Sequence, residues 1–453
     1  MTRTYRALFE PGRIGRLTLK NRIVMAPMGS NFAEEDGSCG PRIQAYYETR
    51  ARGGAGLLTM GVCAVAFPAG TAEPYQVGIS QDDHIPGLAE LTRRVHAQGA
   101  KIGMQLQHAG KTATRDMTAG RDLWVPSVPP PQKSTMLQAF TPLELSTFVG
   151  GLGKQRPRIR VMDRADCQQM TQWFADAAAR AQQAGFDGIE LHAAHSYIFA
   201  GFLSPYYNKR DDEYGGAIAN RARLLTDTLR AVKARCGADF PVWVRLDGEE
   251  LRTKGGIQPA DAAAAALLAV QAGADAVSVS AYATLTEGKA FTEAPLAQEP
   301  NAFLPYAREV KAAVKVPVIL AGRVEPEEAE AAIERGDIDF VAMGRPRAAD
   351  QAAPRQARRR APVHLLLRVR QPDLHQPARQ VRGQPADRPR VRVPDRAGDQ
   401  PQARAGDRRR PGRHGSRARG RAAWPPRHAG RAQRPPGRHA VLRRAGLYRE
   451  RRA

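Results

Sequence analysis

The chain has 453 residues and a formal net charge of +24 at pH 7, and its length is enough for one large domain or two to three average ones. The charge is unevenly placed: residues 347–453 hold 30 arginines, no lysine and 7 acidic residues, a net of +23. Residues 1–346 are left with 39 basic and 38 acidic residues, a net of +1. The basic character therefore does not describe residues 1–346, which we expect to be an ordinary globular protein.

The sequence shows neither a membrane-spanning nor a secretory signal. No run of about 18 apolar residues is found, so no transmembrane helix is expected. The N-terminus has no apolar segment of the secretory type. The four cysteines (Cys39, Cys63, Cys167 and Cys236) form no CxxC pair. We therefore predict free thiols and a cytoplasmic location.

Eight short apolar runs follow one another along residues 1–346, as expected for strands buried on both faces. They span residues 23–26, 57–60, 102–107, 188–191, 242–245, 276–279, 318–320 and 340–343. Stretches with helical periodicity separate several of them, at residues 172–184, 220–235, 261–272 and 326–335. Eight such units predict the α/β class and a (β/α)8 TIM barrel. The alternative, a doubly wound open sheet, would want a GxGxxG motif after its first strand, and the chain has none there.

Residues 126–165 form a long insertion between the third strand and the helix at 172–184. Because the segment leaves from the end of a strand where barrel sites form, we interpret it as a lid or subdomain. The alternative is an excursion without structure of its own.

The residues at the carboxyl ends of the predicted strands are of types that could together bind one cofactor. A parallel barrel gathers these ends around one site. Candidate neighbours of a flat cofactor ring are Pro27, Met28, Gly29, Gly61 and Gln105. The last two strands each end in a Gly-Arg pair, Gly322-Arg323 and Gly344-Arg345. Because barrels commonly bind phosphate after strands seven and eight, the two pairs indicate a phosphate site, although one pair alone could be a plain turn.

His192, His195 and Tyr197 follow the fourth predicted strand directly. Two imidazoles can donate hydrogen bonds to one substrate oxygen, and a phenol can deliver a proton, which suits polarisation of an electron-poor double bond. No side chain supplies hydride, so a redox cofactor is required. The alternatives are a metal site, for which the loop offers no third ligand, and two structural histidines beside a packing tyrosine.

Arg245 is a cation on an otherwise apolar strand. A buried cation needs a partner. It could be an ion-pair partner such as Asp247 or Glu190, or an anionic reduced flavin at its pyrimidine edge. Gln105 likewise could contact a ligand or be a satisfied interior amide.

These residues resemble a known family. The segments Asn21–Met28, Gln105–Gly110, His192–Asn208, Asp212–Gly216 and Met343–Pro346 are similar to the Old Yellow Enzyme flavin oxidoreductases, closest to the iron–sulfur branch that includes 2,4-dienoyl-CoA reductase. The resemblance covers about residues 5–346. It implies FMN as cofactor and NAD(P)H as reductant.

The resemblance also implies roles for the candidate residues. Hydride would pass from the flavin to the β-carbon of an α,β-unsaturated carbonyl, an enone or dienoyl substrate. His192 and His195 would bind the carbonyl oxygen and Tyr197 would protonate the α-carbon. Gln105 and Arg245 would bond the pyrimidine edge of the flavin, Pro27, Met28, Gly29 and Gly61 would line it, and Gly322, Arg323, Gly344 and Arg345 would hold its phosphate.

The chain departs from this branch after Pro346. The branch continues with cysteines for a 4Fe–4S cluster, whereas residues 347–453 are rich in Arg and Pro and have no cysteine. Such a composition predicts a disordered tail. Reread one nucleotide downstream, the codons available to Val363–Leu366 permit Cys-Ile-Ser-Cys, and those of Val369 and Val381 permit two more cysteines. We therefore hypothesise a frameshift near Pro346-Arg347, which sequencing the DNA across the junction would test.

Three functions remain open from the sequence. The first is an FMN-dependent ene-reductase acting on a small enone or dienoyl substrate, with assembly into a homo-oligomer left open. The second is a nucleic-acid-binding protein acting through its basic tail, where binding would be nonspecific. The third is an inactive product of a damaged gene.

Overall fold

The computed structural model describes residues 5–130, 141–142, 157–283, 291–292 and 299–344. All of them belong to one compact unit, Met1–Pro377. The predictions for Arg345, for most of the insertion 126–165 and for the tail 347–453 lie outside the described residues.

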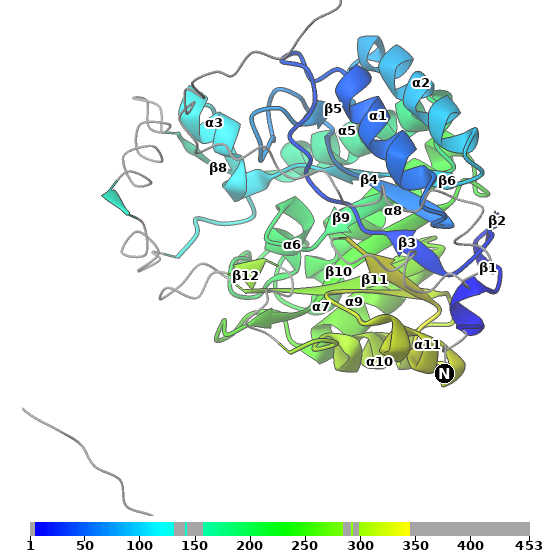
Figure 1. Ribbon diagram of the computed structural model, residues 1–453. Coiled ribbons are helices and arrows are strands. Elements are labelled where there is room, and N and C mark those ends of the chain that lie inside the picture. Colours follow the sequence, from blue (N-terminus) through cyan, green and yellow to red (C-terminus); the bar gives the residue numbers. More distant parts are fainter. Residues whose placement is uncertain (1–4, 131–140, 143–156, 284–290, 293–298, 345–453) are drawn as a thin grey trace, which may run out of the picture. The chain divides into compact units, whose positions relative to one another are not determined.

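Eight parallel strands form a closed barrel. They are β3 (Ile23–Met25), β4 (Leu57–Ala64), β6 (Lys101–Gln107), β9 (Gly188–Ala193), β10 (Val242–Leu251), β11 (Ala276–Ala283), β13 (Val318–Ala321) and β14 (Phe340–Met343). Each pairs with its neighbour in this order, and β14 pairs with β3, which closes the ring (Figure 1). The predicted (β/α)8 barrel is confirmed, and the open sheet is excluded because a doubly wound sheet has two unpaired edges.

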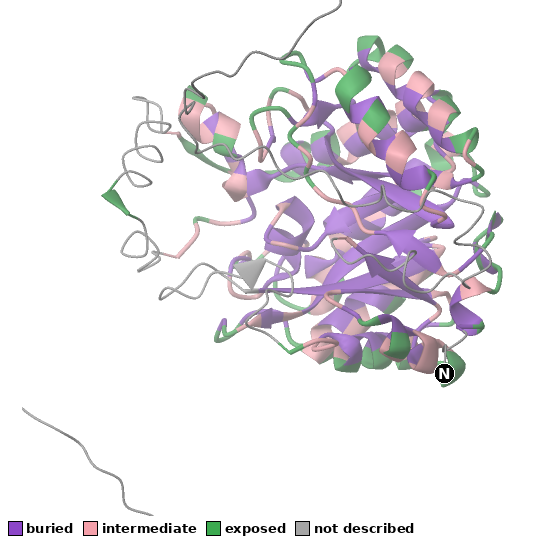
Figure 2. Ribbon diagram, viewed as in Figure 1, coloured by how far each residue is buried: buried purple, intermediate pink, exposed green. Residues whose placement is uncertain are grey.

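Helices surround the barrel and bury one face each against it (Figure 2). In the described residues these are α1 (Pro41–Ala51), α2 (Ile85–His96), α5 (Arg164–Gln183), α8 (Arg223–Cys236), α9 (Pro259–Gln271), α10 (Leu304–Ala313) and α11 (Pro326–Glu334). Helix α5 begins eight residues before the predicted start at 172. A capping box explains this, because Asp166 N–H donates to Asp163 Oδ1 at 2.8 Å and Asp163 N–H donates back to Asp166 Oδ2 at 3.2 Å.

An apolar plug closes the barrel where the strands begin. The hairpin of β1 (Gly12–Ile14) and β2 (Leu17–Leu19) packs Ile14 and Leu19 against Trp243, Ile319 and Phe340. Trp243 is fully buried. Its ring occupies the space beside Gly103, where an added Cβ would come within 2.2 Å of it.

Short elements lie at the opposite end, where the strands finish. They include 3-10 turns and the helices α3 (Thr114–Ala119), α6 (Ile198–Leu203) and α7 (Ile218–Arg221), with the strands β5 (Val77–Gly78) and β12 (Phe291–Thr292). Two further strands, β7 (Leu123–Val125) and β8 (Ile159–Val161), pair in parallel. This pair joins the two flanks of the long insertion, so the insertion leaves and re-enters the unit at neighbouring points.

Candidate active site

The period of two along each strand decides which side chains enter the barrel. On β10 the residues Trp243, Arg245 and Asp247 share one face. Since Trp243 belongs to the plug at the closed end, Arg245 and Asp247 follow it toward the open end. The register then pairs Arg245 with His192 and Gln105 with Glu190 across neighbouring strands.

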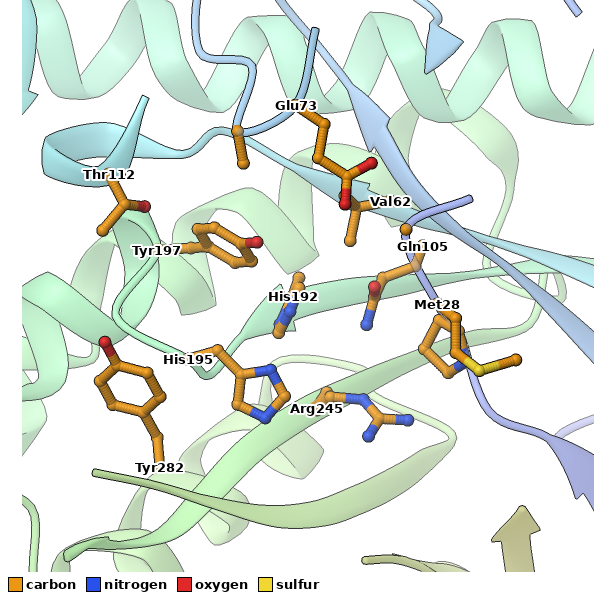
Figure 3. A pocket seen from close by; sticks show the side chains of 13 residues that line it. Met28, Val62, Glu73, Gln105, Thr112, His192, His195, Tyr197, Arg245 and Tyr282 are labelled. Atoms are coloured by element: carbon orange, nitrogen blue, oxygen red, sulfur yellow. The ribbon is translucent and has the colours of Figure 1, made fainter. Parts of the chain in front are cut away.

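A cavity of about 350 Å³ opens at this end of the barrel (Figure 3). Eight of the predicted site residues line it together: Pro27, Met28, Gly29, Gln105, His192, His195, Tyr197 and Arg245. They come from four strand ends that lie far apart in the sequence. The parallel topology thus gathers these candidates in one place, as the barrel prediction required.

Glu190 connects the two polar residues predicted at the pyrimidine edge. Its Oε2 accepts a hydrogen bond from Gln105 Nε2 at 2.7 Å and one from Arg245 Nε at 3.3 Å. Both members of the ion pair are buried, with side chains 5 % and 1 % exposed. The predicted ion pair between Arg245 and Glu190 is therefore formed. The Arg245 side chain also lines the cavity.

His192 is buried and electrically neutral at ordinary pH. Burial, with smaller contributions from His195 and Arg245, lowers its pKa well below the ordinary value. The backbone N–H of Ala194 donates to His192 Nδ1 at 3.4 Å. Nδ1 therefore acts as an acceptor, and the proton of the neutral ring is assigned to Nε2, which becomes a hydrogen-bond donor.

His195 is placed by an unusual backbone conformation. His195 and Ser196 both have positive φ, 57° and 65°, and Asp247 Oδ2 accepts the His195 N–H at 2.8 Å. Ser280 Oγ lies 2.9 Å from His195 Nε2. Burial and the charge of Arg245 lower the pKa of His195 to about 3. This imidazole is therefore also neutral, with its Nε2 hydrogen-bonded to the Ser280 hydroxyl.

Tyr197 stands next to the two imidazoles at the start of α6. Its ring centroid is 4.7 Å from that of His192, at an interplanar angle of 81°, and the two imidazole centroids are 4.9 Å apart. Figure 3 shows all three side chains projecting into the cavity. The group thus offers two neutral N–H donors and a phenol to one bound molecule.

Gly61 packs against two residues that line the cavity. A Cβ at Gly61 would lie 2.4 Å from Pro27 Cβ and 2.9 Å from Gln105 Oε1, so no larger side chain fits there without movement. A Cβ at Gly344 would lie 3.0 Å from Met28 Sδ. Gly61 and Gly344 therefore stand behind Pro27, Gln105 and Met28 and are not themselves among the cavity's lining residues.

Three of the four predicted phosphate residues, Gly322, Arg323 and Gly344, follow β13 and β14 directly, and none of the three is among the cavity's lining residues. Gly322 has φ of 132°, and a Cβ there would come within 2.3 Å of Phe303, so glycine is required. Arg323 has φ of 50°. The backbone therefore turns at once after β13.

The lining residues fit a flavin on their chemistry. Gln105 Nε2 is used by Glu190, so the amide oxygen Oε1 is the atom with which Gln105 can accept a donor such as the N3–H of the ring. Arg245 can donate to the ring carbonyl and nitrogen acceptors beside it. Pro27, Met28 and Gly29 line the same cavity. We therefore take these residues as the ones that would hold FMN.

Five further lining residues were missed by sequence reasoning: Val62, Ala72, Glu73, Thr112 and Tyr282. Val62 lies within β4 and Tyr282 near the end of β11, and the other three lie after β4 and β6, all beyond the apolar runs that marked the strands. Lys111 was also missed. It donates to Ser196 Oγ beneath His195, and burial lowers its pKa to about 8. Only the proximity of these loops to strand ends could have indicated them.

The metal alternative for His192 and His195 has no support in the described residues. No group of three or more His, Cys, Asp or Glu side chains there is placed to hold an ion. The cysteines, three of them buried, are free thiols, so a 4Fe–4S cluster has no support either. Within the same residues, no helix is long and apolar enough to cross a membrane.

Comparisons with known proteins agree with this geometry. A model of the NADH:flavin oxidoreductase / NADH oxidase family matches residues 7–363. The NADH oxidase of Thermoanaerobacter brockii is 37 % identical over 357 residues, covering 78 % of this chain and 50 % of the relative. The cinnamate reductase of Clostridium sporogenes is 34 % identical over 379 residues, covering 77 % and 52 %. The chain thus spans about half the length of these two relatives.

A solved structure supports the same assignment. The Old Yellow Enzyme homologue from Zymomonas mobilis superposes with a TM-score of 0.62 at 27 % identity, covering 79 % of this chain and 94 % of that one. The shared region contains the barrel and its open end. The chain therefore belongs to the NADH:flavin oxidoreductase / NADH oxidase family.

Proposed function

We propose that this protein is an FMN-dependent ene-reductase, which uses NAD(P)H to reduce the C=C bond of an α,β-unsaturated carbonyl or dienoyl substrate. One observation carries the proposal. Two neutral imidazoles and a tyrosine line the same cavity as the residues that fit the pyrimidine edge of a flavin. The name of one relative, cinnamate reductase, describes reduction of this class of double bond.

The neutrality of His192 and His195 decides how they act on a carbonyl. Each neutral ring carries one N–H and can therefore donate one hydrogen bond. Two donors on one carbonyl oxygen stabilise the negative charge that develops there when the β-carbon receives hydride. Because the donors are preorganised in a buried site, their effect is larger than in water.

The other side chains complete the reaction. When bound, FMN supplies the hydride. Tyr197 lies against His192 and delivers a proton to the α-carbon from its phenol oxygen. Asp247 and Ser280 hold the His195 loop and ring in place. Gly322, Arg323, Gly344 and Arg345, as the family resemblance implies, would hold the FMN phosphate.

The test begins with the cofactor. Protein purified in the presence of FMN should be yellow, and the released flavin should be close to one per chain. The holoenzyme should then oxidise NADH or NADPH in the presence of a cyclic enone under anaerobic conditions, with the saturated ketone as product.

Two results would overturn the proposal. The first is a folded protein that cannot be reconstituted with FMN. The second is a holoenzyme whose flavin is reduced by NAD(P)H but is not reoxidised by any member of a panel of enones, enals, nitroalkenes and dienoyl thioesters.

A further inference from the structure

Glu73 is a carboxylate in the cavity wall that the proposed reaction does not use. It lies between β4 and β5 and lines the cavity together with His192, Tyr197 and Arg245. Figure 3 shows its carboxylate turned into the cavity near Val62. Its Oε1 lies 1.9 Å from where a Cβ on Gly29 would be, so the carboxylate sits directly over the first strand end.

Two loops hold this carboxylate in position. It accepts a hydrogen bond from the backbone N–H of Asn31. Asn31 has φ of 52°, and its side chain accepts the Tyr75 N–H at 2.7 Å. Ala33 N–H donates to the carbonyl of Tyr75 at 3.1 Å. The loops after β3 and β4 are thereby joined on both sides of Glu73, which keeps its carboxylate from swinging out to solvent.

The charges around the cavity leave Glu73 without compensation. Among the described residues that line it, Arg245 is the one permanent cation, and the carboxylate of Glu190 already pairs with it at 3.3 Å. His192 and His195 are neutral. Burial raises the pKa of Glu73 above its ordinary value, and the Asn31 N–H opposes this only in part. When ionised, Glu73 therefore gives the wall a net negative charge.

We infer that Glu73 is a specificity-determining residue: it favours unsaturated carbonyl substrates that carry a cationic or hydrogen-bond-donating group and disfavours those that carry a carboxylate. A substrate carboxylate would lose its hydration and meet a like charge in a partly buried site, which is unfavourable. An ammonium group or hydroxyl would instead pair with Glu73. The inference rests on the proposed function and names a substrate class for the same site.

The experiment uses a matched set of aryl enones on the FMN-loaded enzyme. The set is benzylideneacetone and its para-carboxylate and para-trimethylammonium derivatives, at pH 8 and low salt. The measured quantity is the ratio of kcat/KM for the ammonium compound to kcat/KM for the carboxylate. We expect a ratio of about ten or more in the wild type, since a unit charge interacts with Glu73 across a partly shielded cavity.

Variants distinguish the effect of the Glu73 charge on the ratio from the effect of the overall charge of the protein. Glu73→Gln should bring the ratio to within about threefold of one, because the side-chain shape is kept and the charge is lost. Glu73→Ala serves the same purpose if the glutamine variant folds poorly. Glu35→Gln, an exposed position on the neighbouring loop, should leave the ratio at its wild-type value.

The wild-type ratio is decisive together with the variants, because the two substituents also differ in their electronic effect on the enone. A wild-type ratio of one or less would overturn the inference, and so would a ratio that survives in both Glu73 variants. Failure of the proposed function is distinguishable, because benzylideneacetone itself would then not be reduced. In that case the dissociation constants of the two charged compounds, measured through the absorbance of the oxidised flavin, still test the role of Glu73.

Discussion

Where the barrel strands begin, Trp243, Ile319 and Phe340 pack with the β1–β2 hairpin into an apolar plug. Where the same strands end, Gln105, Arg245 and His192 face a polar cavity of about 350 Å³. On β10 only one residue, Val244, separates Trp243 in the plug from Arg245 in the cavity. The comparison shows that one strand can serve stability at one end and chemistry at the other. Four experiments test this difference between the two ends of the barrel.

The largest effect is expected at the open end, from Tyr197→Phe. Loss of the proton donor should slow reduction of a saturating enone by about 10²–10⁴-fold. Reduction of the flavin by NAD(P)H needs no proton from this phenol and should change little. Stopped-flow measurement of the two half-reactions separates them. Equal slowing of both would contradict the assignment of Tyr197 as proton donor.

At the closed end, Trp243→Ala should act on stability instead. Removing a fully buried indole should lower the free energy of unfolding by about 3–5 kcal/mol. Urea denaturation of the FMN-loaded protein measures this loss. Enone reduction per folded, FMN-containing molecule should stay within a few-fold of wild type, since the ring lies in the plug and does not line the cavity. A selective loss of turnover without a loss of stability would show that the two ends are coupled.

A change of pH should affect the open end through its histidines. The pKa of His195 is lowered from 6.5 to about 3, so between these values the unfolded chain binds a proton that the folded protein does not. Stability is therefore full above pH 6.5 and falls as the pH drops, by about 1.4 kcal/mol per pH unit for each such histidine. His192 and His108, whose pKa values are also lowered, act in the same direction.

Urea midpoints at pH 7, 6 and 5 test this pH dependence. The His195→Asn variant should show a shallower dependence, by about one proton in the folding equilibrium. An unchanged slope in that variant would mean that the imidazole is not held neutral by its surroundings.

The smallest effect is expected from a pair of neighbouring serines on β11. Ser280 Oγ bonds His195 Nε2 at 2.9 Å, so Ser280→Ala should cost about 1 kcal/mol of apoprotein stability. Ser278 Oγ is buried and has no hydrogen-bond partner among the described residues. Ser278→Ala should therefore be neutral or slightly stabilising. Thermal unfolding of the two apoproteins compares them directly, and equal losses would contradict the assigned hydrogen bond.

The sequence predicted the barrel well because buried parallel strands leave an unambiguous signal. All eight apolar runs fall on barrel strands, and their starts agree to within one residue. The periodicity of apolar residues was less informative where polar contacts decide at which residue an element begins. The start of α5 depends on the capping box of Asp163 and Asp166, and the β1–β2 hairpin has only three residues in each strand.

The candidate site was predictable to the extent that it lies on strand ends. His192 follows an apolar run directly, and Gln105 and Arg245 lie within two others, so their convergence followed from the fold. Glu73 and Thr112 are on loops without periodic patterns, and nothing in their spacing indicates that the chain turns back over the cavity. The sequence left two possible ion-pair partners for Arg245, Asp247 and Glu190. The register between β9 and β10 decides for Glu190.

The pairing of β7 with β8 has a consequence for how this enzyme can diversify. Adjacent strands are only about 4.8 Å apart. The pairing of β7 with β8 therefore holds the exit and return points of the long insertion close together. Lengthening a segment whose ends are already fixed costs little additional chain entropy. Exchanges or expansions of this segment can therefore accumulate over evolutionary time without weakening the barrel, which allows descendants of one scaffold to acquire new substrates.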